Sequence, residues 1–347
     1  MNKLPLWSWA VPLAGLALLF AWGTSAPALL VLAGLLGAVF AAVHHAETVA
    51  QRLGEPFGTL VLALSVTVLE AGMIVSIMLA GDSPTVARDS IFAALMIALN
   101  GILGLCLVLG GFRHFAQSFR PVAANALLVV LMPLALLTLV LPSHTTTTPG
   151  PVFSAPQLIF VSIIAFVLYG LFLYVQLVRH RTDFVVDHGL DGEPPSRIAA
   201  WLAFVLLLLA LLVVILLAKK LSPTLEAGVA AIGAPVSVVG IVIAAIVLLP
   251  EGITAVKAAA TNNMQTALNL ALGSIVACVG LTIPAVAVVA LYLGEPLHLG
   301  LDASMTVLLG LTFLLLAVTM GSGRTTVLEG TVHLAVFFAF LVFSFLP

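Results

Sequence analysis

Long apolar stretches separated by short polar connections run along the whole chain. A bilayer core of ~30 Å is crossed by about 20 apolar residues in a helix. Lipid leaves unpaired backbone groups unsatisfied, and barrel strands would be half as long and alternate, so these stretches are predicted as helices. They lie at about 7–23, 27–44, 58–80, 89–110, 122–142, 155–178, 198–218, 234–257, 267–293, 302–320 and 326–346. The predicted fold class is an all-α integral membrane protein with about 11 transmembrane helices.

Composition agrees with lipid as the main solvent. Of 347 residues, 62% are hydrophobic and 7% are charged, whereas a soluble domain carries roughly 25% charged residues. No basic patch interleaved with aromatic residues is present, which argues against nucleic acid as a partner. Cys106 and Cys278 lie in apolar stretches and form neither a disulfide framework nor a zinc site. The N-terminal stretch lacks an A-x-A-like cleavage site, so residues 1–26 are predicted as a retained extra transmembrane helix.

The distribution of Lys and Arg predicts the orientation. Cytoplasmic loops carry an excess of these residues, and this bias favours a cytoplasmic N-terminus and a C-terminus outside the bacterial inner membrane. The side that is then cytoplasmic holds Lys3, Arg52, Arg113, Arg120, Arg179, Arg181, Arg197, Lys257 and Arg324, against Arg88, Lys219 and Lys220 outside.

The longest polar connection, 179–197, divides the chain after the extra helix into two units of five helices, 27–178 and 198–347. Because five is odd, the two units must be inserted in opposite orientations. Inverted repeats of this kind are typical of transporters, whose substrate site lies near the midplane between the halves. The acidic cytoplasmic loop could sense calcium or pH; a solvated linker is the alternative, since its spacing does not match an EF-hand.

Two of the fourteen acidic residues, Glu70 and Glu251, lie well inside predicted spans. Each falls in the second helix of its five-helix unit, so the two occupy matching positions. An ionised carboxylate near the bilayer centre costs several kcal/mol, and such residues mark ion or proton pathways. The alternative is a protonated glutamate that only hydrogen-bonds between helices. We predict that Glu70 and Glu251 bind the transported cation and protons.

Hydroxyl groups near the two glutamates could add oxygen ligands, which a hard cation prefers. Ser65, Thr67 and Thr254 lie about one turn from a glutamate, although such hydroxyls often bond to the carbonyl four residues earlier. Pro250 frees a backbone carbonyl beside Glu251. The third helix of each unit adds Asn100, next to Gly101, and Ser274, next to Gly273. For Asn100 and Ser274 the alternative is small-residue helix packing.

Paired buried carboxyls also suggest a mechanism. Burial in a low dielectric favours the neutral, protonated form, and a bound cation can replace the protons. If only occupied forms cross between inward- and outward-open states, the result is obligatory exchange. No resident cofactor is expected, because Ca²⁺, Na⁺ or K⁺ and H⁺ are the cargo. The oligomeric state is left open, with a homo-oligomer among the options.

Three weaker candidates lie outside the two glutamate helices. Glu329 and His333 are spaced i, i+4 and could relay protons, or Glu329 could be a solvated helix-start residue. Glu47, beside His44 and His45, could line a cytoplasmic entry or belong to a plain interfacial cluster.

Three segments carry a resemblance to a known family: AETVAQRLGEPFGTLVLALSVTVLEAGMIVSIM (46–78), LLPEGITAVKAAATNNMQTALNLALGSIVACVGLTIP (248–284) and GSGRTTVLEGTVHLAVF (321–337). The first two resemble the α-repeats of the calcium/cation antiporter superfamily, and nearly the whole chain resembles its bacterial ChaA-type calcium–sodium(potassium)/proton antiporters. The resemblance implies cation/proton antiport, with an acidic residue of each repeat binding the cation. Those residues map onto Glu70 and Glu251.

The chain departs from the wider superfamily at one position in each half. Calcium/proton exchangers usually have a Gly-Asn pair shortly before each acidic residue. Here the pairs are Val66-Thr67 and Val247-Leu248, so an asparagine oxygen is missing from both halves. Monovalent cations therefore become plausible co-substrates.

Rival functions fit the sequence less well. No pair of mid-span aspartates and no H-E-x-x-H motif is present, which argues against an intramembrane protease. A passive channel usually lines its pore with rings from several subunits, whereas paired acids in inverted halves of one chain suit an exchanger. No phosphate-binding loop is present to couple ATP hydrolysis.

Overall fold

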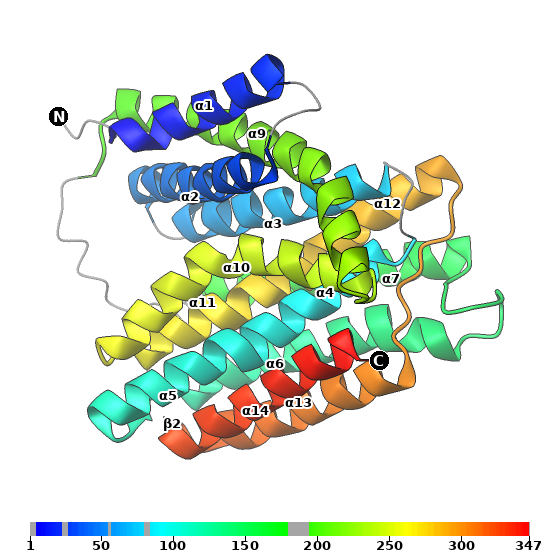
Figure 1. The fold of residues 1–347 in the computed structure, drawn as a ribbon. Helices are drawn as coiled ribbons and strands as arrows, with labels where there is room; N and C mark the ends of the chain where they lie inside the picture. Colours follow the sequence, from blue (N-terminus) through cyan, green and yellow to red (C-terminus); the bar gives the residue numbers. More distant parts are fainter. Residues whose placement is uncertain (1–4, 23–26, 55–56, 80–83, 180–193, 347) are drawn as a thin grey trace. The chain divides into compact units, whose positions relative to one another are not determined.

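The computed structural model describes residues 5–22, 27–54, 57–79, 84–179 and 194–346, and nearly all of them are helical (Figure 1). Ten helices in the described residues are long and apolar enough to cross a membrane, and an eleventh, α1 (Leu6–Trp22), has 17 residues. The predicted all-α membrane fold is confirmed. Most of the predicted acidic loop, residues 180–193, lies outside the described residues.

The chain forms two compact units. The first contains residues Met1–Asp82 and Asp187–Gly233. Its described helices are α1, α2 (Ala28–Leu53), α3 (Phe57–Met78) and α9 (Arg197–Ala231). Helix α9 packs along α2 and also contacts α1 and α3 (Figure 1).

Two helices of this unit are longer than the sequence pattern predicts. The stretch predicted at 27–44 continues as helix to Leu53, and the one predicted at 198–218 continues to Ala231. Lys219 and Lys220 end the apolar run but do not end the helix, because lysine is a good helix former. Ser222 beyond them donates a 3.0 Å hydrogen bond to Glu226 one turn later. The apolar run therefore predicts the segment suited to lipid, and the helix itself continues beyond that segment.

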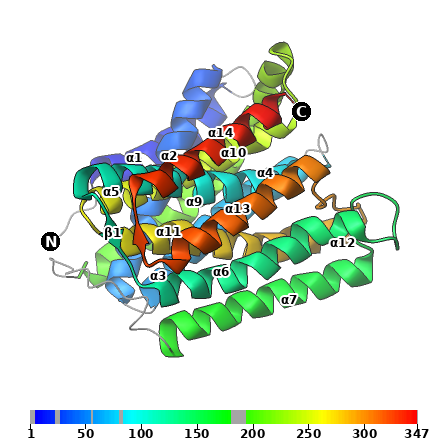
Figure 2. The ribbon, with the colours of Figure 1, turned by 90° about the horizontal axis from the view of Figure 1, so that it is seen from below.

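The second unit contains Ser83–Val186 and Ala234–Pro347 (Figure 2). Its first group of elements is α4 (Val86–Met96), η2 (Ile97–Ile102), α5 (Leu103–His114), β1 (Gln117–Ser118), α6 (Pro121–Ala135), η3 (Leu136–Val140), η4 (Leu141–His144), α7 (Ala155–Tyr174) and η5 (Val175–Arg179). Its second group is α10 (Ser237–Ala260), α11 (Met264–Ala277), η6 (Cys278–Thr282), α12 (Ile283–Leu293), α13 (Ala303–Gly321), β2 (Arg324–Thr325) and α14 (Val327–Phe345). Strands β1 and β2 pair antiparallel, with Gln117 opposite Thr325.

These units do not coincide with the two predicted five-helix repeats, because α9 packs with α1, α2 and α3. The repeats concern chain order and direction of insertion, and they remain a prediction.

Helix α4 forms the core of the second unit. Every residue of α4 except Arg88 is buried. Helix α10 approaches it closely, since a Cβ built at Gly240 would lie 2.9 Å from the carbonyl carbon of Asp89. Buried Asp89 is neutralised by Arg88, with 2.8 Å between Arg88 Nη2 and Asp89 Oδ1. A helix buried all round occupies the centre of its bundle.

A π-helical segment interrupts the third span of each predicted half. In the first half η2 connects α4 to α5, and in the second half η6 connects α11 to α12. Single π turns inside α-helices are frequent at functional sites, because they re-aim side chains and loosen the backbone ladder. Asn100 lies within η2, and Ser274 lies one turn before η6.

Candidate cation- and proton-binding site

Glu251 lies on α10, which forms a hairpin with α11. The Ser274 hydroxyl on α11 donates a hydrogen bond of 2.5 Å to Glu251 Oε2. Hydrogen bonds between hydroxyls and carboxylates are short and roughly twice as strong as neutral ones. Glu251 is half-buried, and Ser274 is half-buried as well. Two of the predicted site residues are thus in direct contact.

The turn of this hairpin is fixed by side chains from the last residue of α5 and from β1. Gln117 Nε2 donates to the Ala259 carbonyl at 2.8 Å, and His114 Nε2 donates to the Ala260 carbonyl at 3.2 Å. The His114 ring satisfies a carbonyl at the end of α10, and Gln117 is a second donor to the Ala259 carbonyl, which also accepts from the Asn262 backbone N–H at 3.1 Å. Asn262 turns the chain with a φ of 63°, and Asn263 caps α11. The register between Glu251 and Ser274 is therefore set by the hairpin.

The neighbours of Glu251 within α10 serve the helix rather than the carboxylate. Thr254 Oγ1 donates to the Pro250 carbonyl at 3.0 Å, and its side chain is exposed. Gly252 allows close contact with η2, because a Cβ there would lie 3.0 Å from Ile102 Cδ1. Gly252 therefore has a packing role, and the Thr254 hydroxyl bonds to its own helix.

Glu70 lies on α3 in the first unit and is buried, with 6% of its surface exposed. The two predicted hydroxyl ligands near it bond to their own helix: Ser65 donates to the Val61 carbonyl at 2.7 Å, and Thr67 donates to the Ala63 carbonyl at 2.9 Å. This is the common pattern for hydroxyls in membrane helices. Gly72 lies where α3 packs on α9, and a Cβ there would lie 2.6 Å from Ile215 Cδ1, so that side chain would have to move.

Asn100 belongs to a buried polar network of the second unit. Its Nδ2 donates to Thr312 Oγ1 at 2.9 Å, and Thr312 Oγ1 donates onward to the Leu308 carbonyl at 2.8 Å. Its Oδ1 accepts from His333 Nδ1 at 3.1 Å. The other ring nitrogen of His333 lies 3.3 Å from Thr319 Oγ1.

Which groups donate and which accept in this network follows from the Leu308 carbonyl at its end. The Leu308 carbonyl only accepts, so Thr312 donates to it and receives from the Asn100 amide nitrogen. The Asn100 oxygen then faces His333, whose Nδ1 must carry the proton. Both ends of the Asn100 amide are thus engaged within the protein core. Asn100 holds η2 against α13 and α14, and its oxygen is committed to His333.

Thr312 and Thr319 are the members of this network that sequence reasoning missed. They lie seven residues apart on α13, and both are buried, with 0% and 2% of their surface exposed. Residues seven apart share one helix face. Two hydroxyls on one face of an otherwise apolar span were the available signal.

The glycines next to Asn100 and Ser274 differ in how closely other atoms surround them. A Cβ built at Gly101, next to Asn100, would lie 3.3 Å from the Phe337 ring. A Cβ built at Gly273, next to Ser274, would meet no described atom within 4 Å. Small-residue packing therefore accounts for Gly101 and does not account for Gly273.

Glu329 and His333 have different partners. Glu329 Oε2 accepts from the Thr326 backbone N–H at 2.8 Å and also from the Thr326 hydroxyl, which forms a capping box at the start of α14. Such a box satisfies N–H groups at the helix start. His333 is fully buried and bonds within the Asn100 network. The structure thus places Glu329 as a helix-start residue.

Glu47 lies half-buried on α2, next to the contact between α2 and α1. The neighbouring His45 is fully buried and donates from Nε2 to the Ser8 carbonyl at 2.8 Å. His44 lies against Trp7, with ring centroids 5.2 Å apart. The two histidines therefore join α1 to α2. In the described part of the chain, no three His, Cys, Asp or Glu side chains form a cluster that could hold a metal ion.

Residues 27–178 and 202–346 match the family model described as sodium/calcium exchanger protein. The chain belongs to this family. A putative ionic transporter, y4hA of Sinorhizobium fredii, is 50% identical over 99% of this chain and 97% of its own length. The sodium-potassium/proton antiporter ChaA of Escherichia coli is 36% identical over 96% of this chain and 94% of its own length.

The fold has a solved counterpart in native YfkE. That structure covers 98% of this chain and 99% of its own, with a TM-score of 0.74 and 20% sequence identity. Because the relatives of this family are transporters, the chain is a multi-pass membrane transporter and not an enzyme.

Proposed function

We propose that the protein is a secondary active antiporter that exports Ca²⁺, Na⁺ or K⁺ in exchange for H⁺ by alternating access. Glu70 and Glu251 are its cation- and proton-binding groups. The observation that carries the proposal is the Glu251–Ser274 hydrogen bond of 2.5 Å, which holds a membrane carboxylate at a defined position. The 36% identity to a sodium-potassium/proton antiporter supports the choice of ions.

The chemistry follows from charge balance in a low dielectric. A carboxyl group inside the membrane is stable when a proton or a cation neutralises it, and costly when it is ionised alone. A cation that arrives from one side displaces protons, and protons that arrive from the other side displace the cation. Exchange is obligatory when the empty, charged form cannot change its orientation.

Two glutamates acting together would neutralise one divalent cation. Their positions in the second helix of each predicted repeat support a joint role. Ser274 supplies a hydroxyl that can bond to the Glu251 carboxylate or turn its oxygen toward a cation.

Ion selectivity is expected to be broad. The asparagine oxygen common in calcium/proton exchangers is replaced by Thr67 in the first half and by Leu248 in the second. The Thr67 hydroxyl donates to the Ala63 carbonyl, and Leu248 has no oxygen in its side chain. Ca²⁺ prefers six to eight oxygens, so a site with fewer fixed oxygens discriminates less against Na⁺ and K⁺.

The proposed setting is the bacterial inner membrane, with the N-terminus in the cytoplasm. The excess of Lys and Arg on one side supports this orientation. The S. fredii and E. coli relatives are bacterial. No resident cofactor is proposed, because proton and cation gradients supply the energy.

Everted membrane vesicles with an imposed proton gradient test the proposal. Adding Ca²⁺, Na⁺ or K⁺ should dissipate the gradient in vesicles that contain the protein. Glu70→Gln and Glu251→Gln should each abolish this effect, because glutamine cannot exchange a proton for a cation. Glu329→Gln is the matched control: it removes one carboxylate from the membrane domain, and glutamine can still form the capping box.

Two outcomes would contradict the proposal. Cation flux that persists without a proton gradient and does not move protons would indicate a passive channel. Normal exchange in both glutamate variants would remove these residues from the site. Measuring the three cations side by side would establish selectivity.

A further inference from the structure

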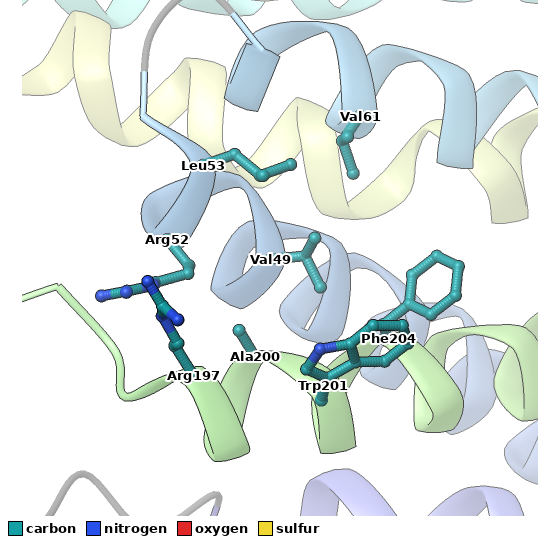
Figure 3. Close-up of a pocket in the computed structure, with 8 residues that line it drawn as sticks. All are labelled: Val49, Arg52, Leu53, Val61, Arg197, Ala200, Trp201 and Phe204. Carbon is teal, nitrogen blue, oxygen red and sulfur yellow. The ribbon is translucent and has the colours of Figure 1, made fainter.

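A hollow of about 360 Å³ lies within the first compact unit, at the end of α2 and the start of α9 (Figure 3). Helix α2 contributes Val49 and Arg52 to its lining, α3 contributes Val61, and α9 contributes Arg197, Trp201 and Phe204. The two arginines lie at one end and the two aromatic residues at the other (Figure 3). The hollow is therefore amphipathic, with a cationic end and an apolar end.

The cationic end has two guanidinium groups with spare hydrogen-bond donors. Arg52 Nη1 donates to the Pro195 carbonyl at 3.4 Å, which leaves most of its five N–H groups for another acceptor. Among the described residues, no carboxylate forms an ion pair with Arg52 or Arg197. Helix α9 begins at Arg197, so its positive dipole end lies at the same place; the Ser196 hydroxyl caps it by accepting from the Ala199 N–H at 3.2 Å. This end is suited to an anion that accepts several hydrogen bonds.

The apolar end extends along the membrane-spanning part of α9. Trp201 and Phe204 pack edge to face, with ring centroids 5.9 Å apart and an interplanar angle of 89°. Trp201 is 69% exposed, which leaves a large apolar ring for a ligand or lipid to cover. Tryptophan concentrates where lipid head groups meet acyl chains. A free inorganic anion would use none of this wall, whereas an amphiphile would use both ends.

We propose that this hollow binds an anionic phospholipid, and that the site is separate from the cation/proton site. The phosphate diester accepts hydrogen bonds from Arg52 and Arg197, and the first methylenes of an acyl chain cover Trp201 and Phe204. Guanidinium groups bind phosphate oxygens in a bidentate manner, and basic pockets between membrane helices bind anionic head groups. In the proposed orientation the lipid comes from the cytoplasmic leaflet.

Native mass spectrometry of the delipidated full-length protein in detergent tests the proposal. The probes are dioleoyl phosphatidylglycerol, dioleoyl phosphatidylcholine with the same chains, and inorganic phosphate. Wild type should bind phosphatidylglycerol preferentially. Neutralising one arginine should weaken this binding about five-fold, and Arg52→Gln/Arg197→Gln about thirty-fold, from ~1 kcal/mol for each cationic side chain at a membrane surface.

Arg324→Gln is the matched control, because it removes an exposed arginine of the second unit with the same change in charge. Trp201→Leu should weaken phosphatidylglycerol binding and leave arginine-dependent head-group selectivity intact. Arg52→Lys/Arg197→Lys keeps both charges and should retain part of the affinity, which keeps the test informative if the glutamine variant does not fold. Phosphatidylglycerol should also raise the unfolding temperature of wild type more than that of Arg52→Gln/Arg197→Gln.

Three results would overturn the lipid site. They are equal binding of the two phospholipids, an equal loss of affinity in Arg324→Gln, and displacement of the lipid by millimolar inorganic phosphate. None of these results depends on ion exchange, so a failed antiport assay would leave the lipid site untouched.

Discussion

Helices α3 and α10 each carry one membrane glutamate, and the hydroxyl groups near these glutamates are used in two different ways. On α3, Ser65 and Thr67 donate to carbonyls of their own helix at 2.7 and 2.9 Å. On α10, Thr254 does the same at 3.0 Å, but Ser274 reaches Glu251 from the neighbouring helix at 2.5 Å. A hydroxyl one turn away on the same helix thus serves the backbone, and the one supplied by a second helix serves the carboxylate.

The reason is geometric. A serine or threonine in a helix reaches the carbonyl four residues earlier without moving the backbone, so this bond forms wherever no better partner is close. A bond between helices needs a fixed register, and the α10–α11 turn supplies it through Gln117 and Asn262. Proximity in sequence to an acidic residue is therefore a poor guide to its ligands.

The largest expected effect is on the pH dependence of Ca²⁺ binding, and it tests whether Glu70 and Glu251 act as one site. If one Ca²⁺ replaces a proton on each, the half-saturating Ca²⁺ concentration should rise about 100-fold for each unit of pH decrease, once the pH is low enough that both carboxyls of the empty site are protonated. The sign follows because the protonated form cannot bind the cation, so low pH weakens binding. Na⁺ or K⁺ exchanged for one proton should show about a tenfold rise. Initial rates in proteoliposomes at several pH values measure this.

The glutamate variants refine the same test. Under a joint role, Glu70→Gln/Glu251→Gln should be no more defective than either single variant, because each change already removes the site. A tenfold slope for Ca²⁺, with residual exchange in one single variant, would show that the two carboxylates work separately.

The next effect separates the hydroxyl of α11 from those bonded to their own helix. Ser274→Ala should raise the half-saturating cation concentration about tenfold, since hydrogen bonds to charged groups contribute ~1.5–3 kcal/mol. Ser65→Ala and Thr254→Val should change it by less than about twofold, because both hydroxyls bond to backbone carbonyls. Cation titrations of the three variants at one pH compare them directly. Similar changes in cation affinity in all three variants would show that the Ser274 hydroxyl has no special role at Glu251.

The sequence predicted the membrane fold and the two glutamates because both rest on a strong physical penalty. Charges and unpaired backbone groups are costly in lipid, so long apolar runs and their rare interruptions by acids are readable without a structure. Helix ends were less readable: the Lys219-Lys220 pair ends an apolar run, and α9 continues to Ala231.

Side-chain partners were the least predictable feature. Asn100 and Ser274 lie in matching spans and looked equivalent, yet Asn100 bonds to Thr312 and His333, whereas Ser274 bonds to Glu251. The difference depends on which helix packs against each residue and on the π segment η2, and no local pattern encodes either.

A third prediction tests this split between Asn100 and Ser274. Asn100→Ala should lower the free energy of unfolding by about 1–3 kcal/mol, because the buried His333 Nδ1–H loses its acceptor and Thr312 Oγ1 loses the amide donor. Cation affinity of the remaining folded protein should stay close to wild type. Unfolding in detergent, followed by the loss of monodisperse protein with temperature, measures the first effect. Ser274→Ala should show the reverse balance: weaker cation binding, with a smaller loss of stability than Asn100→Ala because Ser274 and Glu251 are only half-buried.

The coupling between Asn100 and His333 gives the control for this prediction. If the network is the cause, Asn100→Ala/His333→Ala should destabilise the protein by less than the sum of the single changes, because the second change removes a partner that is already lost. Additive effects would show that the two side chains contribute independently.

The smallest expected effect belongs to Glu329, which lies at the start of a predicted span, whereas Glu251 lies well inside one. The Glu329 carboxylate accepts from the backbone and hydroxyl of Thr326, so it is used at the start of α14. Glu329→Ala should cost about 1 kcal/mol of stability through loss of the capping box, and Glu329→Gln should cost less. Exchange rate and its pH dependence should be unchanged in both variants, as measured in the same proteoliposomes. A shifted pH profile in Glu329→Gln, which keeps the cap but cannot carry a proton, would instead make Glu329 part of the proton path beside His333. It would also show that a carboxylate bound to backbone can still serve transport.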